Sequence, residues 1–463
     1  MKIFLTRSVV LASLALCARA QTYNTAALVS GDVAWVLISS ALVFFMIPGL
    51  GYFYSGLVET KNAQALLHVV LLIFAVVCVQ WCLIGYTISF SDTSPSTFIG
   101  DVQYAALLKT TTSQNAVAAT IPASCFALYQ MMFAGITPGL FVGATAGRMR
   151  FMPTMIFSVL WSTVVYDPIC YWIWSNNGWL HNLNVMDYAG GCVVHVSAGT
   201  TALVLAILLP RRKDFLIREY QPHSPNFVYL GTAMLWFGWM GFNGGSSVAA
   251  NMRGADAVLA SNLAASAGGL VWMGLDAVVN RKRFGSVSFC TGAVAGLATI
   301  TPGSGFVQPG FGLIIGGLAG VVCFYSVRLV KRMRIDDSLD VTGVHGVGGA
   351  LGTILTGAFA QYSITSVNAT TYTAGWVDRV WVAVGVQVAA VVATAAWSAL
   401  WSIIFVLVLN VIPGMQLRCS EEAEITGLDI SEVGEKAYEF LDGSDEVVTL
   451  SQSVRRGKVD VEA

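Results

Sequence analysis

Long apolar segments occur along almost the whole of this 463-residue chain, and they leave few folds open to it. Hydrophobic residues make up 56% of the chain and charged residues only 11%, which a soluble domain of this length would not tolerate. A segment of about 20 apolar residues crosses the hydrocarbon core of a bilayer as an α-helix, because a helix satisfies its own backbone hydrogen bonds there. We therefore predict an all-α, polytopic membrane protein.

Eleven segments are long and apolar enough to cross. They cover approximately residues 33–56, 64–90, 121–146, 153–174, 191–209, 227–249, 257–279, 287–302, 308–327, 341–361 and 377–411. The first ten form two sets of five, and because five is odd, the second set is inserted upside down relative to the first. Inverted repeats of this kind, here followed by a last long helix, place sites near the membrane midplane between the halves.

The two ends of the chain have different compositions from its middle. Residues 1–20 combine a charged start, a short apolar run and Ala18-Arg19-Ala20, the pattern of a secretory signal peptide, with an uncleaved leader as the alternative. Residues 21–414 then form the transmembrane domain, and residues 415–463 form a hydrophilic tail. Its acidic stretch Glu421–Glu424 is expected to dock on basic inner loops, helped by Tyr438 and Phe440; a disordered tail is the alternative.

The Lys and Arg residues of the loops predict the orientation. With the N-terminus outside, the five cytoplasmic loops hold fourteen of them and the outer loops three, a strong positive-inside bias. The cytoplasmic set is Lys61, Arg148, Arg150, Arg211, Arg212, Lys213, Arg218, Arg281, Lys282, Arg283, Arg328, Lys331, Arg332 and Arg334; the outer set is Lys109, Arg253 and Arg379. The C-terminus is then cytoplasmic, and Asn368, in the sequon Asn368-Ala369-Thr370, is an extracellular glycosylation candidate.

Two stretches place an Asp ahead of a His at the start of a span. Asp187 to His195 opens the fifth span, and Asp340 to His345 opens the tenth. An ionisable residue inside a span is costly and usually faces a cavity or a partner. One such His is often only a packing residue, but two in corresponding places indicate a shared site. No third His, Cys or carboxylate stands at ligand spacing, which disfavours zinc, haem or copper.

Aromatic residues gather at the outward ends of spans three, four and six. Tyr129, Trp174 and Ser246 fall there, with Phe133 and Phe242 deeper in the same spans. Trp and Tyr near an interface usually belong to the aromatic belt. Ring faces that converge also attract a small cation, with about 1 to 2 kcal/mol per partly desolvated ring. A cation site is therefore the second interpretation.

Several motifs resemble those of the ammonium transporters of the Amt/Mep family. The matching stretches are Gly31–Trp35, Pro48–Tyr54, Asp187–His195, Gly238–Ser246, Asp336–Gly349 and Gly427–Asp429, in that family's order over about residues 25 to 440. The resemblance implies an eleven-span protomer that assembles as a homotrimer in the plasma membrane. It also implies a transporter of ammonium and methylammonium, not an enzyme, without a cofactor. The formal net charge of −1 gives no indication of nucleic acid.

Residue by residue, the resemblance assigns roles to the candidates above. It implies an outer ammonium-recruitment site at Tyr129, Trp174 and Ser246, with Asp187 supporting it. Phe133 and Phe242 would close the pore entrance, and His195 with His345 would line a path for ammonia. Conducting ammonia avoids the several kcal/mol needed to strip an ion of its water. A sensor that transports little remains the alternative, and the tail's regulator is unknown.

The chain departs from the family's pattern at three places. Position 129 is Tyr where bacterial members commonly have Phe, Gly147 stands before Arg148 where an acidic residue is usual, and Val433 replaces a common His. The first change keeps a ring face, so cation recruitment is still expected. The other two concern the inner loops and the tail, where regulation is then less certain.

Overall fold

The computed structural model describes residues 28–111, 113–215, 217, 220–281, 283–367 and 373–438, and these form helices without any named strand. The all-α prediction is therefore confirmed. The predicted signal peptide at residues 1–20, the sequon at Asn368, and the tail beyond residue 438, including Phe440, lie outside the described residues.

The helices of the first half follow the predicted spans. They are α2 (Ser30–Leu57); α3 (Ala63–Gln80), continued by η3 (Trp81–Gly85) and α4 (Tyr86–Phe90); α5 (Ala123–Val142); α6 (Phe151–Trp161), continued by η6 (Ser162–Tyr166) and α7 (Asp167–Trp174); and η7 (Gly191–Val196) with α9 (Ser197–Leu208). Segments η3, η6 and η7 are π-helical. Short helices η2 (Thr60–Asn62), η4 (Ala105–Leu107), η5 (Gly143–Thr145) and α8 (Trp179–Asn182) lie in the connections.

The second half repeats this order. It contains α10 (Pro225–Gly244), α11 (Met252–Val279), α12 (Ser286–Ile300), α13 (Phe311–Arg332), and the π-helical η9 (Thr342–Val347) with α14 (Gly348–Phe359). The last long helix is α16 (Ala383–Val411). Short helices η8 (Gly245–Ser247), α15 (Tyr362–Thr365), η10 (Trp376–Asp378), α17 (Glu421–Thr426) and η11 (Asp429–Val433) complete the described residues.

Eight of the described helical segments are long and apolar enough to cross a membrane by length and composition. The segments α10, α12 and η9 with α14 occupy the remaining predicted spans, so the arrangement is consistent with eleven crossings. The largest difference from the predicted bounds is at the last span, which begins at Ala383 instead of residue 377, because residues 376–378 form η10.

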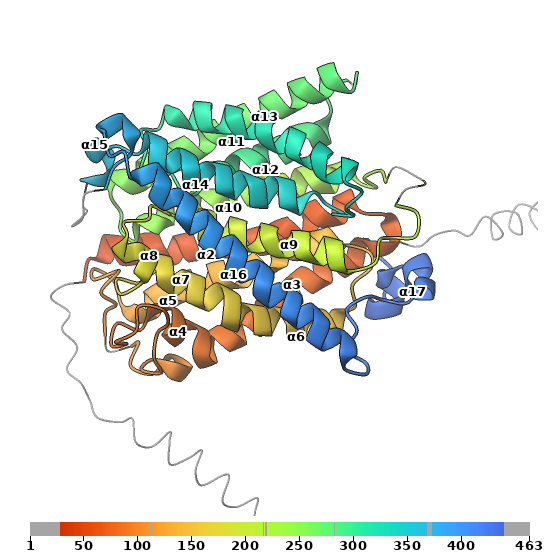
Figure 1. Ribbon diagram of the computed structural model, residues 1–463, viewed down its shortest axis with the longest axis horizontal. Coiled ribbons are helices and arrows are strands. Elements are labelled where there is room, and N and C mark those ends of the chain that lie inside the picture. Colours follow the sequence, from red (N-terminus) through yellow and green to blue (C-terminus); the bar gives the residue numbers. More distant parts are fainter. Residues whose placement is uncertain are drawn as a thin grey trace, which may run out of the picture.

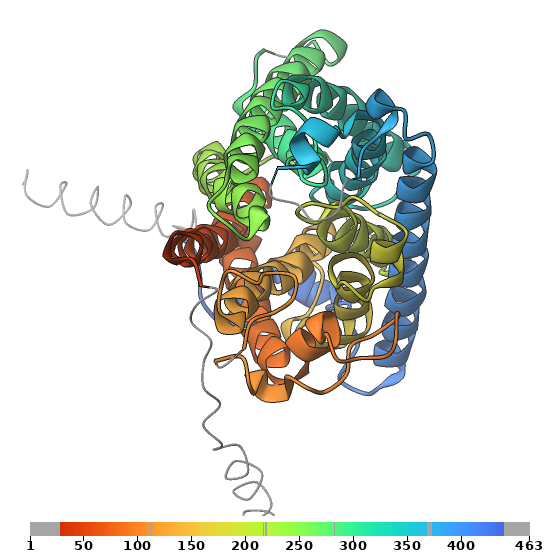
Figure 2. The same cartoon turned by 90° about the vertical axis from the view of Figure 1, so that its left-hand side faces the viewer.

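The two halves pack around a shared centre in equivalent ways. Helix α2 contacts α10, α5 contacts α9, and α12 contacts α14 in the corresponding place. Across the centre, η7 contacts α14 and η9 contacts α9. Viewed end-on in Figure 2, the first half (red to yellow) and the second half (green to cyan) form two groups side by side. These pairings are those of two inverted repeats.

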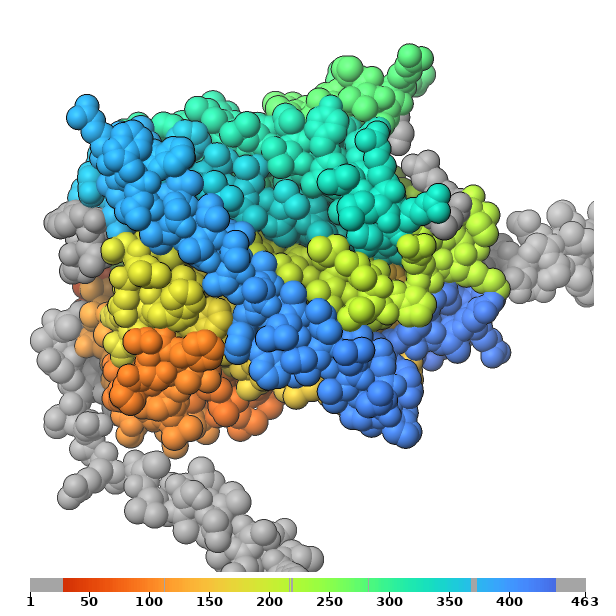
Figure 3. Space-filling view, in the orientation of Figure 1, coloured from red at the N-terminus to blue at the C-terminus, as the bar shows by residue number. Residues whose placement is uncertain are grey.

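Helix α16 holds the two halves together from one side. It contacts α6 and α9 of the first half and α14 of the second. In the space-filling view of Figure 3 it runs obliquely, in blue, over both halves. Helix α16 has no counterpart in either set of five. Since it contacts both sets, it connects the two halves on this side of the bundle.

The loops predicted to be cytoplasmic meet at one end of the molecule. In Figure 1, α8 and α15 lie at one end of the bundle and α17 at the other. At the α17 end, Asp336 pairs with the fully buried Arg148 at 3.2 Å and with Arg212 at 2.6 Å. Burial alone would raise the pKa of Asp336, but hydrogen bonds from Arg212 and the charge of Arg148 hold it below its ordinary value. These ion pairs join three of the loops predicted to be cytoplasmic.

Candidate functional site: a path between the two halves

An open cavity of about 770 Å³ lies at the end of the bundle that carries α8 and α15. Its lining includes Gln130, Trp174, Asp187, Ser246 and Arg253. These residues come from both halves, so the cavity forms only when the halves pack together. Of the residues proposed from sequence for an outer site, Trp174, Ser246 and Asp187 line this cavity.

Tyr129 lies one layer behind the cavity wall. Its side chain is fully buried, and its hydroxyl oxygen is 2.9 Å from the Phe242 carbonyl and 3.3 Å from Ser246 Oγ. Ser246 Oγ donates to the same carbonyl at 2.8 Å. Tyr129 therefore fixes the end of α10 and η8, and it meets the cavity through Ser246 instead of through its own ring face.

Two closely packed Phe rings lie behind Trp174, which lines the outer cavity. Phe133 of α5 and Phe242 of α10 have ring centroids 4.1 Å apart, and Trp174 packs edge-on against Phe133 at 5.9 Å. Both Phe side chains are almost fully buried. The pair lies between Trp174, which lines the outer cavity, and His195, whose ring is 6.3 Å from that of Phe242. That it closes a pore entrance, as the family resemblance implies, stays a prediction.

The side chain of Asp187 is hydrogen-bonded to the backbone of the helix that follows it. Its carboxylate accepts hydrogen bonds from the amides of Gly190, Gly191, Cys192 and Val193, at 2.8, 2.5, 2.8 and 3.2 Å. Gly190 makes the turn possible with a φ of 117°, a left-handed conformation that favours glycine. These are the amides that a helix N-terminus leaves unpaired, so Asp187 caps η7. Its role is to hold the helix that carries His195.

The counterpart of Asp187 in the second half is Asp337, not Asp340. Asp337 accepts from the amides of Val341 and Thr342 at 3.1 and 2.7 Å, and it stands eight residues before His345, as Asp187 does before His195. Asp340 instead pairs with Lys331 at 3.1 Å, and both residues line a cavity of about 190 Å³. The shorter Asp340 to His345 spacing suggested the wrong equivalent, because capping depends on where the helix starts.

His195 and His345 meet at the centre of the molecule. Their Nδ1 atoms are 3.2 Å apart, and their rings lie nearly parallel with centroids 5.2 Å apart. Both side chains are buried, with 1% and 4% exposure. A contact between two ring nitrogens requires one to donate and the other to accept, so at most one of the two facing nitrogens carries a proton. In the described part of the chain, His195 Nε2 has no hydrogen-bond partner, so this nitrogen is available to a ligand.

Glycines allow the two helices that carry the imidazoles to cross this closely. A Cβ on Gly199 would lie 2.2 Å from Gly346 Cα, and one on Gly349 would lie 2.6 Å from His195 Cβ. Each glycine stands four residues after the His of its own half. The crossing is therefore built the same way from both sides, and any larger side chain would push the spans apart.

A narrow apolar cavity and then a wider polar one continue the path inward. The narrow cavity has about 10 Å³, near the minimum for one water, and its lining includes Leu140, Trp239, Phe242 and both imidazoles. His345 also lines a second cavity of about 190 Å³ toward the inner loops. Outer cavity, ring pair, paired imidazoles and inner cavity thus follow one another through the protein.

Sequence reasoning missed three residues of this path. Trp239 stacks on His195 at 5.7 Å, and Gln130 lines the outer cavity. Arg253 places a positive charge there, fixed by its Nε donating to the Gly305 carbonyl at 2.6 Å and by the rings of Tyr188 and Phe306 at 4.9 and 4.6 Å. Trp239 stands three residues before Phe242, almost one helical turn, which is the signal that identifies it.

Comparisons with known proteins were made with the whole chain. A family model described as "Ammonium Transporter Family" matches residues 34–438. Ammonium transporter 1 of Schizosaccharomyces pombe is 46% identical over 435 residues, covering 94% of this chain and 86% of that protein. Ammonium transporter MEP2 of Saccharomyces cerevisiae is 40% identical over 417 residues, covering 88% and 83%.

Solved structures agree with this family. The crystal structure of Saccharomyces cerevisiae Mep2 has a TM-score of 0.82 at 37% identity and covers 90% of this chain and 93% of its own. That of Candida albicans Mep2 has a TM-score of 0.82 at 38% identity and covers 89% and 91%.

Proposed function

This chain belongs to the ammonium transporter family, and we propose that it recruits ammonium at the outer cavity, removes a proton and conducts ammonia past His195 and His345. The observation that carries the proposal is the Nδ1 contact of 3.2 Å between the two imidazoles, with the Phe242 ring 6.3 Å from that of His195. No other polar side chains of the described residues line the narrow cavity.

Recruitment of the cation is supported by the wall of the outer cavity. Trp174 and Ser246 line it, and Tyr129 orients Ser246 from behind. An indole face attracts a small cation, and a hydroxyl oxygen accepts a hydrogen bond from it. Both carboxylate oxygens of Asp187 already accept hydrogen bonds, from four backbone amides in total, so neither oxygen binds the cation directly. Recruitment then rests on the ring and hydroxyl groups.

Passage as ammonia is supported by the size and polarity of the interior. A cavity of about 10 Å³ lined by apolar side chains and two imidazoles cannot hold a hydrated ion. Ammonia needs only a donor and an acceptor, which a pair of neutral imidazoles provides. Potassium cannot lose a proton, so it would have to enter as an ion and pay the full cost of dehydration.

The proposal extends to the setting of the protein. We place it in the plasma membrane as a homotrimer with methylammonium as a second substrate, the N-terminus extracellular and the tail, residues 415–463, cytoplasmic and regulatory. The positive-inside bias of the loops supports this orientation. Cleavage after residue 20 and glycosylation of Asn368 belong to the same proposal.

Three variants test the proposed path. We expect His195→Arg to abolish ammonium uptake, because a permanent charge at that depth is a barrier of a few kcal/mol. His345→Ala should lose selectivity before throughput, since a wider path admits hydrated cations. His68→Ala is the matched control, because His68 packs on Phe151 away from the path.

Fluxes of ammonium, methylammonium and potassium are measured at matched surface expression. If His195→Arg and His345→Ala carry ammonium and reject potassium as His68→Ala does, the two histidines are packing residues and the proposed path is wrong.

A further inference from the structure

The first half contains a buried carboxyl group that the proposed path does not use. Asp167 is the first residue of α7 and has no solvent exposure. It stands seven residues before Trp174, about 10 Å below the outer end of the helix at 1.5 Å per residue. It lines none of the three cavities of the path. A carboxyl group buried this deeply in a span is energetically costly, which indicates a function separate from the path.

Gln80, the last residue of α3, is the side chain that contacts it. Gln80 Nε2 donates to Asp167 Oδ2 at 2.7 Å and lies 3.1 Å from Thr163 Oγ1. Among the described residues, no side chain donates to the buried Asp167 Oδ1, and the Ser89 hydroxyl donates to the Asp167 backbone carbonyl at 3.4 Å. The two oxygens of the carboxyl group are therefore in different states, one an acceptor and the other unpaired.

Both helices are π-helical at this contact. Segment η3 starts directly after Gln80, and segment η6 ends directly before Asp167. Such π-helical insertions are rare and frequently occur at functional sites. They coincide here on two adjacent helices, at the residues that face each other, so the local geometry is arranged around the Gln80 and Asp167 pair.

No positive charge compensates an ionised Asp167. In the described part of the chain, no Lys, Arg or His lies within ion-pair distance of it. The neighbouring segments η3, α4 and α16 contain no Lys, Arg, His, Asp or Glu. His68, the one such residue of α3, is twelve residues from Gln80, about 18 Å along the helix.

The other elements packed against α7 are α4, α8 and η7, and their titratable residues are Tyr86, His181, Cys192 and His195. Of the two histidines, His181 lies 3.4 Å from the Ile173 carbonyl through its Nδ1, and His195 contacts His345, so neither forms an ion pair with Asp167. Two further titratable groups are on the helix of Asp167 itself. Tyr166 and Cys170 are fully buried and neutral groups that offer no positive charge. An unpaired carboxylate in such surroundings would pay the full cost of desolvation, whereas a protonated acid pays only that of a neutral polar group.

We propose that Asp167 is a proton-binding site: its Oδ1 carries a proton at neutral pH, and its Oδ2 is a carbonyl oxygen that accepts from Gln80. Asp167 lines none of the three cavities of the path and its Oδ2 accepts from Gln80, so the ligand of its remaining oxygen is a proton. The site is separate from the paired imidazoles, and it stands whether or not ammonia passes between them.

Infrared spectroscopy of the full chain in lipid tests the site directly. The difference spectrum between wild type and Asp167→Asn should show loss of a protonated carboxylic acid band, which shifts in heavy water. Asp92→Asn is the matched control, because Asp92 is exposed. Its difference spectrum should show only the two bands of an ionised carboxylate.

A second variant covers the case in which Asp167→Asn does not reach the membrane. Gln80→Leu keeps Asp167 but removes the hydrogen bond to Oδ2, so the carboxylic acid band should move to higher frequency. A wild-type spectrum with carboxylate bands at Asp167, or an acid band that Gln80→Leu leaves unmoved, overturns the proposal.

Discussion

Single residues at this site act mainly by holding backbone in place. Asp187 and Asp337 stand eight residues before the two imidazoles, and each caps the helix that carries one of them. Asp187 accepts four amides and Asp337 two. The outer cap is therefore the stronger one, and its loss should displace His195 more than loss of the inner cap displaces His345.

Asp187→Asn replaces one accepting oxygen by an amide that points its own N–H groups at backbone donors. We expect a lower unfolding midpoint and reduced methylammonium uptake, because each hydrogen bond to a charged group contributes about 1.5–3 kcal/mol. Asp337→Asn should lower the midpoint less. Thermal unfolding in detergent and uptake at matched expression check both. Equal midpoints for Asp187→Asn and wild type would exclude the capping role.

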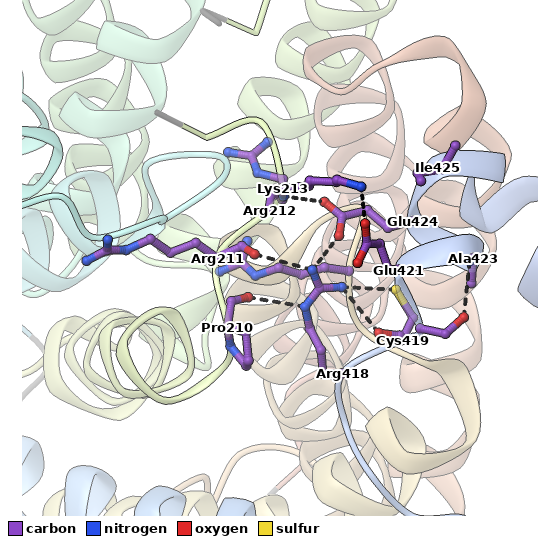
Figure 4. A network of polar contacts seen from close by, with 12 residues as sticks. Pro210, Arg211, Arg212, Lys213, Arg418, Cys419, Glu421, Ala423, Glu424 and Ile425 are labelled. Carbon is purple, nitrogen blue, oxygen red and sulfur yellow. Dashed lines mark hydrogen bonds and ion pairs between the residues drawn. The ribbon is translucent and has the colours of Figure 1, made fainter. Parts of the chain in front are cut away.

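At the scale of elements, the described part of the tail is packed onto the inner loops. Arg418 pairs with Glu424, and its Nε donates to the Pro210 carbonyl at 3.2 Å, while Lys213 pairs with Glu421, as Figure 4 shows. These contacts connect the acidic stretch to the loop between α9 and α10, as the opposite charges predicted. Tyr438 also docks, with its hydroxyl 3.3 Å from His223 Nε2.

The tail also caps two transmembrane helices, which charge alone did not predict. Asp429 accepts from the amides of Gln64 and Ala65 at the start of α3, at 3.2 and 2.7 Å. Glu432 accepts from the Phe151 amide at the start of α6 at 2.8 Å. Undocking the tail therefore exposes unpaired amides on two helices of the first half.

Deleting the chain from Gly427 onward should lower methylammonium uptake without removing the protein from the membrane, because it removes both caps. Asp429→Ala should reproduce part of the loss. Glu435→Ala is the control, since that residue is exposed. Uptake is measured per surface molecule. If the truncated protein and Asp429→Ala both match Glu435→Ala, the tail does not affect transport.

At the scale of the whole molecule, the loops predicted to be cytoplasmic and those predicted to be extracellular lie at opposite ends of the bundle. The basic loops carrying Lys61, Arg148 and Lys213 meet the tail at one end. The outer cavity and the short helix η10, which begins at Trp376, lie at the other end of the bundle. The packing therefore determines which loops share a side, and the basic charges predict that this side faces the cytoplasm.

Cysteine labelling tests this orientation. Val377→Cys and Ile425→Cys are introduced separately into a background without native cysteines, because both positions are exposed, at 47% and 59%. An impermeant thiol reagent should label position 377 in intact cells and position 425 only after permeabilisation. The opposite result would show that the chain is inserted the other way round.

The sequence by itself determined which segments cross and which residues could react. Hydrophobic length is a local property, so the spans from residues 33 to 411 were visible before any contact was known. The same holds for ionisable residues in apolar runs, such as His195 and His345, and for motifs that resemble a family.

Only the tertiary structure decided which groups touch. The helix start selects Asp337 over Asp340, and the glycine crossing brings two Nδ1 atoms to 3.2 Å. The ring contact of Trp239 with His195 and the hydrogen bond of Gln80 to Asp167 also depend on how the helices are rotated against each other. Such contacts join residues up to 150 positions apart, and packing sets their distances to fractions of an ångström, which no local pattern encodes.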